Sequence, residues 1–151
     1  GHRQASANMK IQQLSIFAEN KPGHIAGPCR LLAEQGIDIR ALALADTQRF
    51  GILRMIVSDP AKATKALEAA GHVVKATEVL AIAVADQPGG RAQVLSGLEG
   101  SPVNIEYMYA FPFGRDGKAV LVVRFDDPDA AIKVLQGKGV PVLSSDTVLK
   151  G

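Results

Sequence analysis

Two short segments of the chain combine residue types that can hold a small charged molecule. Asn20-Lys21-Pro22-Gly23 and Asp86-Gln87-Pro88-Gly89 each lie between an alternating apolar run and an apolar run of helical spacing. Proline fixes φ and glycine accepts φ values that other residues refuse, so each Pro-Gly pair predicts a tight turn from a strand into a helix. The first turn of a helix has unpaired N–H groups and the positive end of the helix dipole. Such a turn can bind a carboxylate or a phosphate.

A free amino acid is the ligand whose chemistry these turns suit. Main-chain N–H groups over residues 23–26 and 89–92 can donate to its carboxylate, and Asn20 or Asp86 can accept from its ammonium group. The opposing interpretation is that Asn20 and Asp86 only cap the two helices. The candidate ligand-binding residues at the turns are Asn20, Lys21, Pro22, Gly23, His24, Ile25 and Ala26, then Asp86, Pro88, Gly89, Gly90, Arg91 and Ala92.

Side chains beside the turns have two interpretations each. His24 either contacts a ligand or is solvated at the start of a helix, and the solvated interpretation is favoured because the sequence offers it no partner. Arg91 either contacts a carboxylate side chain or points into water. Tyr107 and Tyr109, with Phe111, form an aromatic row on one face of a predicted strand. Packing in a core or domain interface is the favoured role of this row, and the alternative is a wall for the side chain of the ligand.

Other chemistries lack the residues that they need. The single cysteine, Cys29, excludes an intramolecular disulfide and a cysteine-cluster metal site, and the three histidines form no spaced metal cluster. No Lys-Ser/Thr pair follows Gly89-Gly90, so this segment is not a nucleotide P-loop. No nucleophile, base and orienting residue can be grouped from the sequence. We therefore expect no catalysis, no cofactor and no metal.

Composition narrows the class of protein. Of the 151 residues, 47% are apolar, which is enough for a packed core. Residues 1–8 resemble an expression-tag remnant; without them Lys and Arg number 16 against 15 acidic residues, so the net charge is +1. A nearly neutral chain without a basic run is a poor partner for nucleic acid. No secretory signal and no apolar run of ~20 residues is present, so we expect a cytoplasmic protein without a membrane span.

Hydrophobic spacing predicts the elements that position the turns. A strand over 11–17 precedes the first turn, and a helix that ends at Gly36 follows it. Asp59-Pro60 predicts the start of a second helix, with Asp59 as N-cap, and Gly71 its end. The remaining predicted strands cover 37–44 and 52–57 and begin again at 73, so the order is β-α-β-β-α-β.

This order occurs twice. Pro22 and Pro88 lie 66 residues apart, as do Gly23 and Gly89, and the interval becomes 68 from Pro60 to Pro128. A register kept through strand, turn and helix indicates duplication, with a boundary near residue 77 or 78. Each copy is expected to form a ferredoxin-like βαββαβ unit, an α+β fold with an antiparallel sheet and helices on one face.

These residues resemble the ACT domain family. The resemblance rests on the two polar-x-Pro-Gly turns and on Gly36-Ile37-Asp38-Ile39 and Pro102-Val103-Asn104-Ile105, which match the entry into the second strand of the family. It covers residues 10 to about 149, as one domain over 9–77 and another over 78–151. In the second turn Gly90-Arg91 replaces His24-Ile25, so the two turns are not expected to bind equally.

The resemblance implies a non-catalytic sensor of a small amino acid, bound between ACT domains against these turns. The family also includes tandem ACT proteins without a catalytic domain, and the resemblance implies that this chain is one of them. Ligand binding would then tighten one arrangement of domains or subunits. We expect a homodimer. The alternative is a regulatory subunit that docks onto a metabolic enzyme, with ligand binding secondary; an enzyme on this scaffold is disfavoured because no catalytic residues group together.

Overall fold

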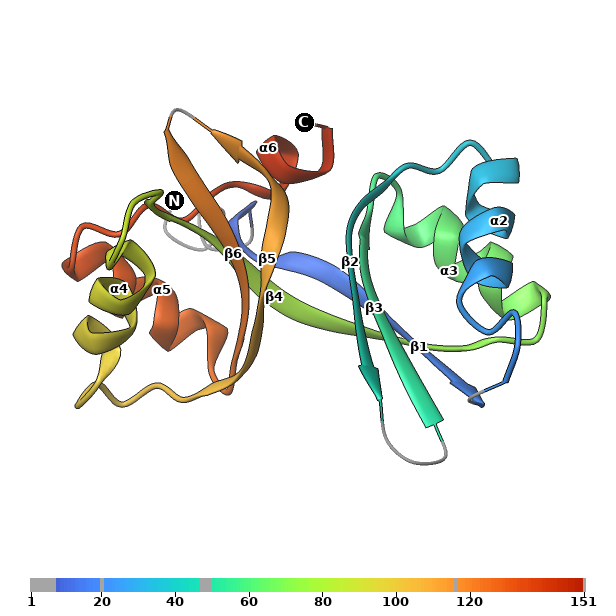
Figure 1. Ribbon diagram of the computed structural model, residues 1–151, viewed down its shortest axis with the longest axis horizontal. Helices are drawn as coiled ribbons and strands as arrows, with labels where there is room; N and C mark the ends of the chain where they lie inside the picture. The colour runs from blue at the N-terminus through green and yellow to red at the C-terminus, as the bar shows by residue number, and fades with distance from the viewer. Residues whose placement is uncertain (1–7, 20, 47–49, 116, 151) are drawn as a thin grey trace. The chain divides into compact units, whose positions relative to one another are not determined.

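The computed structural model describes residues 8–19, 21–46, 50–115 and 117–150 (Figure 1). The chain divides into two compact units. We call Gln12–Thr77 the first repeat, and Glu78–Leu149 with the residues up to Ile11 the second repeat. In the part of the chain that the structure describes, no helix is long and apolar enough to span a bilayer.

The first repeat has the predicted ferredoxin-like order, and the predicted α+β fold is confirmed. Its strands follow the order β2-β3-β1-β4, with β3 antiparallel to both β1 and β2. Helices α2 and α3 cover one face of these strands (Figure 1). The elements are β1 (Ile11–Glu19), α2 (Ala26–Glu34), β2 (Ile39–Asp46), β3 (Phe50–Val57), α3 (Pro60–Ala69) and the start of β4 (Val73–Ala85).

Alternation along the strands places the first-repeat core on the helix side. Leu14 and Ile16 of β1 are fully buried there, and so are Leu32 of α2 and Leu67 of α3. Side chains two residues apart on a strand share a face, so β1 contributes Leu14 and Ile16 to this core, and β3 contributes Leu53, Met55 and Val57. The core thus holds the β1–α2 connection between a buried strand and a buried helix.

The helix boundaries follow from local chemistry. Asp59 is the N-cap of α3 and its side chain accepts from the N–H of Lys62, with Pro60 at the first helical position. Gly71 follows α3 with φ of +90°. These predictions are confirmed. Pro28 is buried in the first turn of α2, where a missing N–H removes no intrahelical hydrogen bond.

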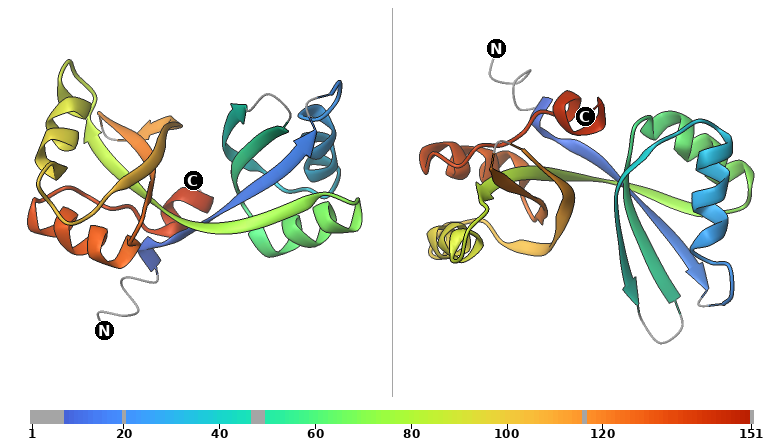
Figure 2. Two further views of the ribbon diagram at one scale, coloured as in Figure 1. Left: turned by 90° about the horizontal axis from the view of Figure 1, so that it is seen from below. Right: turned by 45° about the horizontal axis from the view of Figure 1, so that its top comes forward.

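The second repeat repeats this plan, and its strands follow the order β4-β6-β5. Its core lies between these strands and the helices α4 and α5, and Ile82, Phe125 and Leu135 are fully buried in it (Figure 2). The elements are the rest of β4, α4 (Gly90–Leu98), β5 (Ile105–Arg115), β6 (Lys118–Phe125), α5 (Pro128–Gly137) and α6 (Ser145–Lys150).

Two features depart from a plain duplication. The last strand of the first repeat and the first strand of the second are one continuous strand, β4. The expected last strand of the second repeat is reduced to a single bridge between Ile82 and Val142, and α6 follows it. Pro141 has no N–H to donate, although its carbonyl accepts from the N–H of Ala83 at 3.0 Å.

Candidate functional site

The first Pro-Gly segment forms the predicted turn between β1 and α2. Gly23 has φ of +85°, a conformation that favours glycine. The N–H of His24 donates to the carbonyl of Lys21 at 3.2 Å, and the N–H of Gly27 donates to the carbonyl of Gly23 at 2.9 Å. These bonds close the turn and set the direction in which α2 begins.

The second Pro-Gly segment closes in the same way. Gly89 has φ of +84°. The N–H of Gly90 donates to the carbonyl of Gln87 at 3.0 Å, and the N–H of Gln93 donates to the carbonyl of Gly89 at 2.8 Å. The hydrogen bonds therefore recur at the interval of 66 residues that the sequence shows, so the prediction of two equivalent turns is confirmed.

Each turn leaves main-chain donors available. Within the described residues, no acceptor is found for the N–H groups of Ile25 and Ala26, or of Arg91 and Ala92. These groups belong to the first turns of α2 and α4, where the helix dipole is positive. They are the groups that the sequence predicts as carboxylate donors. Ile25 can offer only its main chain, since its side chain packs against the first-repeat core.

Asp86 does not cap its helix. The N-cap of α4 is Gly89 and no side chain bonds to that cap, while the Asp86 side chain is exposed. The capping interpretation is therefore wrong for Asp86. Asn20 lies outside the described residues, and its predicted role as acceptor for an ammonium group stays a prediction.

Two hollows adjoin the first turn. One has a volume of about 420 Å³ and is lined by residues 21–26. The other, of about 370 Å³, lies between this turn and the turn that joins α3 to β4. We call the latter the α3-side cavity; it is lined by Phe17, Ala18, Lys21, Pro22, Gly23, His24, Gly27, Pro28, Ala70, Gly71, His72 and Val73. Both volumes fall in the range of roughly 300–1,000 Å³ typical of small-molecule sites.

His24 is held inside this site. Its side chain is half-buried, and Nδ1 lies 2.6 Å from the carbonyl oxygen of Lys21. A carbonyl can only accept, so Nδ1 carries the proton of the ring. Nε2 is buried and has no hydrogen-bond partner among the described residues. The solvated interpretation of His24 is therefore wrong.

Cys29, one turn further along α2, is half-buried. Burial raises the pKa of the Cys29 thiol, which keeps it protonated. This agrees with the role of a small apolar residue, since a nucleophilic or metal-binding cysteine acts as the thiolate. Among the described residues, no group of three or more His, Cys, Asp or Glu could hold a metal ion.

The second turn differs from the first at the position of His24. Gly90 is buried, and a Cβ at this residue would lie 2.0 Å from the carbonyl oxygen of Ala85. Only glycine therefore fits here, and the turn packs directly onto the end of β4. Helix α4 begins at Gly90, whereas α2 begins at Ala26, and the Arg91 side chain is exposed.

The aromatic row lies on β5, on one face of a strand as the sequence predicts. Tyr107 and Tyr109 are half-buried and pair with Arg124 and Val122 of β6. Met108, between them, packs against the core under α4 and α5, so the two tyrosines lie on the opposite face of the sheet from these helices. Within the second repeat the structure does not bring the row to the Asp86–Gly89 turn, and its contact with a ligand stays a prediction.

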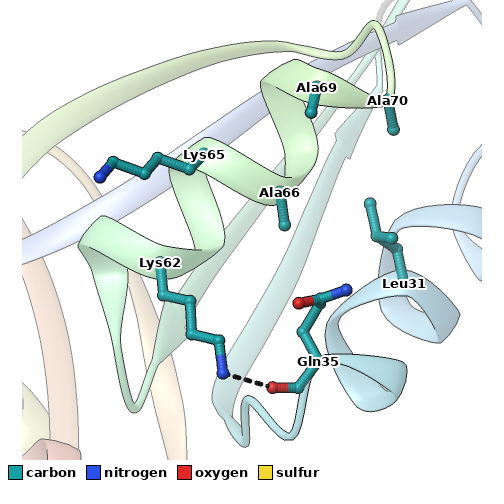
Figure 3. Close-up of a pocket in the computed structure, with 7 residues that line it drawn as sticks. All are labelled: Leu31, Gln35, Lys62, Lys65, Ala66, Ala69 and Ala70. Carbon is teal, nitrogen blue, oxygen red and sulfur yellow. Dashed lines mark hydrogen bonds between the residues drawn. The ribbon is translucent and has the colours of Figure 1, made fainter.

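A groove between α2 and α3 was not anticipated from the sequence. It has a volume of about 490 Å³ and is lined by Leu31, Gln35, Lys62, Lys65, Ala66, Ala69 and Ala70. Figure 3 shows the Lys62 side chain reaching across it, where Nζ donates to the carbonyl of Gln35 at 2.8 Å. This bond satisfies a carbonyl at the end of α2, so it is a capping contact between helices. Helical spacing alone does not show which alanines of α3 face α2.

Comparison with known proteins places these features in a family. A family model described as an ACT domain pair matches residues 9–149, as the sequence predicts. The crystal structure of protein BT0572 from Bacteroides thetaiotaomicron is 41% identical, with a TM-score of 0.87 over 95% of this chain and 98% of that one. The ligand-free regulatory subunit of aspartate kinase from Thermus thermophilus is 17% identical, with a TM-score of 0.60 over 85% of this chain and 92% of that one. No curated protein matches the chain.

Proposed function

Since this chain belongs to the ACT domain pair family, we propose that it is a non-catalytic regulatory protein that binds a small free amino acid. The observation that carries the proposal is the β1–α2 turn of the first repeat. There, two main-chain N–H groups without an acceptor in the described chain adjoin hollows of about 420 and 370 Å³. The carboxylate of the ligand accepts from the N–H groups of Ile25 and Ala26. Its ammonium group donates to the side chain of Asn20.

The first turn is the better site for two reasons. Its hollows are lined by side chains of different chemistry, including Lys21, His24 and Pro22. The second turn instead has Gly90 against the carbonyl of Ala85, so no side chain can project from the equivalent position. Ligand binding at the second turn would rely on Asp86, Arg91 and main-chain N–H groups.

Regulation follows from differential affinity. A ligand shifts an equilibrium between two states of a protein only as far as its affinities for them differ. A ligand at the start of α2 contacts the connection between a core strand and a core helix, so binding favours the state in which this connection has the observed geometry. The proposal assigns no covalent step to the protein.

A thermal-shift screen against free amino acids tests the proposal. A ligand at a hundred times its Kd stabilises the folded state by about 2.7 kcal/mol, which is readily measured. At least one amino acid is expected to raise the melting temperature of the full chain. A flat response to all of them at millimolar concentration contradicts the proposal.

The site is then located with a pair of proline variants. Ala26→Pro removes one N–H donor at the first position of α2, where the N–H takes part in no intrahelical hydrogen bond. A hydrogen bond to a charged group contributes roughly 1.5–3 kcal/mol, so affinity should fall about 10- to 100-fold. Ala92→Pro, at the matching position of the second repeat, should leave the affinity unchanged. Equal losses in both variants contradict binding at the first turn, and unfolding without ligand checks that both proteins are intact.

A second candidate function is that of a regulatory subunit that docks onto a metabolic enzyme. It is supported by the likeness in fold to regulatory subunits of aspartate kinase. The match covers 92% of the Thermus thermophilus subunit. Co-purification with one enzyme, together with no response to free amino acids, favours this candidate over the first.

A further inference from the structure

We propose that the ligand is an amino acid whose side chain is itself a carboxylate, and that this carboxylate occupies the α3-side cavity. The inference rests on the proposed function, because it identifies the ligand class of the same site. It starts from the charges that line the cavity. Lys21, His24 and His72 contribute basic side chains to the described lining, and no Asp or Glu is among those residues.

The basic residues reach the cavity from two different connections. Lys21 and His24 belong to the β1–α2 turn, and His72 belongs to the connection from α3 to β4. The end of β1 and the first turn of α2 add Phe17, Ala18, Gly27 and Pro28, none of which carries a charge. An anion entering the cavity therefore meets the Lys21 ammonium group on one side and the His72 ring on the other, and the Lys21 charge would repel a second ammonium group on the ligand.

His24 adds a specific requirement. With its proton on Nδ1, the neutral ring presents Nε2 as an acceptor, and only the protonated ring presents Nε2 as a donor. Nε2 is buried and has no partner in the described chain, so a ligand group that bonds to it satisfies a buried polar atom. A side-chain carboxylate that reaches this atom after a small shift of the ring supplies an acceptor for Nε2–H⁺. Such a contact requires a ring with protons on both nitrogens.

Apolar side chains at the cavity fit the stem of such a ligand. Phe17 is 38% exposed and Val73 is 64% exposed, so both present apolar surface that a ligand can cover. Both line the cavity together with Pro22 and Pro28. A side chain of one or two methylene groups that ends in a carboxylate can cover these residues and still place its charge near the histidines.

The test is calorimetric titration of the full chain with glutamate, aspartate, glutamine, asparagine and leucine at pH 7. Glutamine and asparagine match the acidic ligands in shape and differ in charge. Glutamate or aspartate is expected to bind at least tenfold more tightly than its amide. His72→Gln and Lys21→Gln should each lower this ratio several-fold, while Lys65→Gln, a lysine of the α2–α3 groove, should leave it unchanged.

Equal binding of acidic ligands and amides, or tighter binding of leucine, overturns this inference and leaves the proposed function intact. Binding of none of the five ligands overturns the inference, and the full screen of amino acids then decides the proposed function separately.

Discussion

The β1–α2 turn and the β4–α4 turn close with the same pair of main-chain hydrogen bonds but present different side chains at one equivalent position. His24 N and Gly90 N donate to the carbonyls of Lys21 and Gln87 at 3.2 and 3.0 Å. His24 then lines two hollows, whereas Gly90 lies against the carbonyl of Ala85. In both turns the preceding glycine has a positive φ, so the main chain follows the same course. The residue after that glycine differs between the turns. A duplicated turn thus keeps its main-chain geometry while the side chains that it presents differ.

The strongest test of this difference is Gly90→Ala. The added Cβ would lie 2.0 Å from a main-chain oxygen, so the end of β4 has to move. Overpacking of this kind costs typically about 1–3 kcal/mol, and we expect the upper part of this range because the clash is with backbone. The free energy of unfolding in urea measures it. Gly27→Ala, at a first-repeat glycine with no atom within 4 Å of the added Cβ, is the control and should not destabilise the protein.

The shared backbone predicts equal effects at the two positive-φ glycines. Gly23→Ala and Gly89→Ala each force an alanine into a left-handed conformation, which costs roughly 1–2 kcal/mol. Neither Cβ meets another atom within 4 Å, so strain is the whole effect. Denaturation should therefore give the same loss of stability for the two variants. Gly→Asn at each position should cost less, since asparagine tolerates this conformation. A cost at only one of the two positions contradicts the equivalence of the turns.

The N-caps of α3 and α5, the second helix of each repeat, take no part in the candidate site and allow a further comparison between the repeats. Asp59 and Asp127 accept from the N–H groups of Lys62 and Ala130, both at 3.1 Å. Replacement of either aspartate by alanine should lower stability by about 1 kcal/mol, and replacement by asparagine should change it little. If Asp127→Asn costs as much as Asp127→Ala, charge rather than capping stabilises α5.

The smallest expected effect concerns Lys10, which lies just before the first strand and pairs with residues of the second repeat. Its Nζ lies 3.1 Å from Asp129 and 3.7 Å from Glu78. The hydrogen bond to Asp129 raises the pKa of Lys10 above its ordinary value, and the two carboxylates add to this effect. Because both carboxylates are largely exposed, Lys10→Gln should cost less than about 0.5 kcal/mol.

The sign of the pH dependence follows from the raised pKa of Lys10. Its contribution to stability is fully present at neutral pH and is lost as the pH rises beyond about 10.4 towards the raised folded value. Denaturation curves of the wild type and Lys10→Gln should therefore converge at alkaline pH. A difference that stays constant from pH 7 to pH 11 means that the lysine stem, and not its charge, stabilises the second repeat.

Much of the fold is predictable because its signals are local. The Asp59-Pro60 start of α3 and the end of this helix at Gly71 depend on φ preferences and on one side chain within three residues of its partner. The last strand of the second repeat is shorter than the duplication predicts, since Pro141 has no N–H and can support only part of a ladder. The capping interpretation of Asp86 is wrong because the left-handed Gly89 takes the N-cap position.

The amino-acid sequence by itself determined the duplication, the two Pro-Gly turns and the helix boundaries, because these depend on residues close together along the chain. Only the tertiary structure showed the cavity beside the first turn and the close packing of the second. That outcome depends on His72 and Val73 lying beside the β1–α2 turn, and on Ala85 lying against Gly90. The burial of His24 Nε2 also depends on tertiary packing. Cavities and buried unpaired atoms arise from the packing of distant segments, which local preferences do not specify.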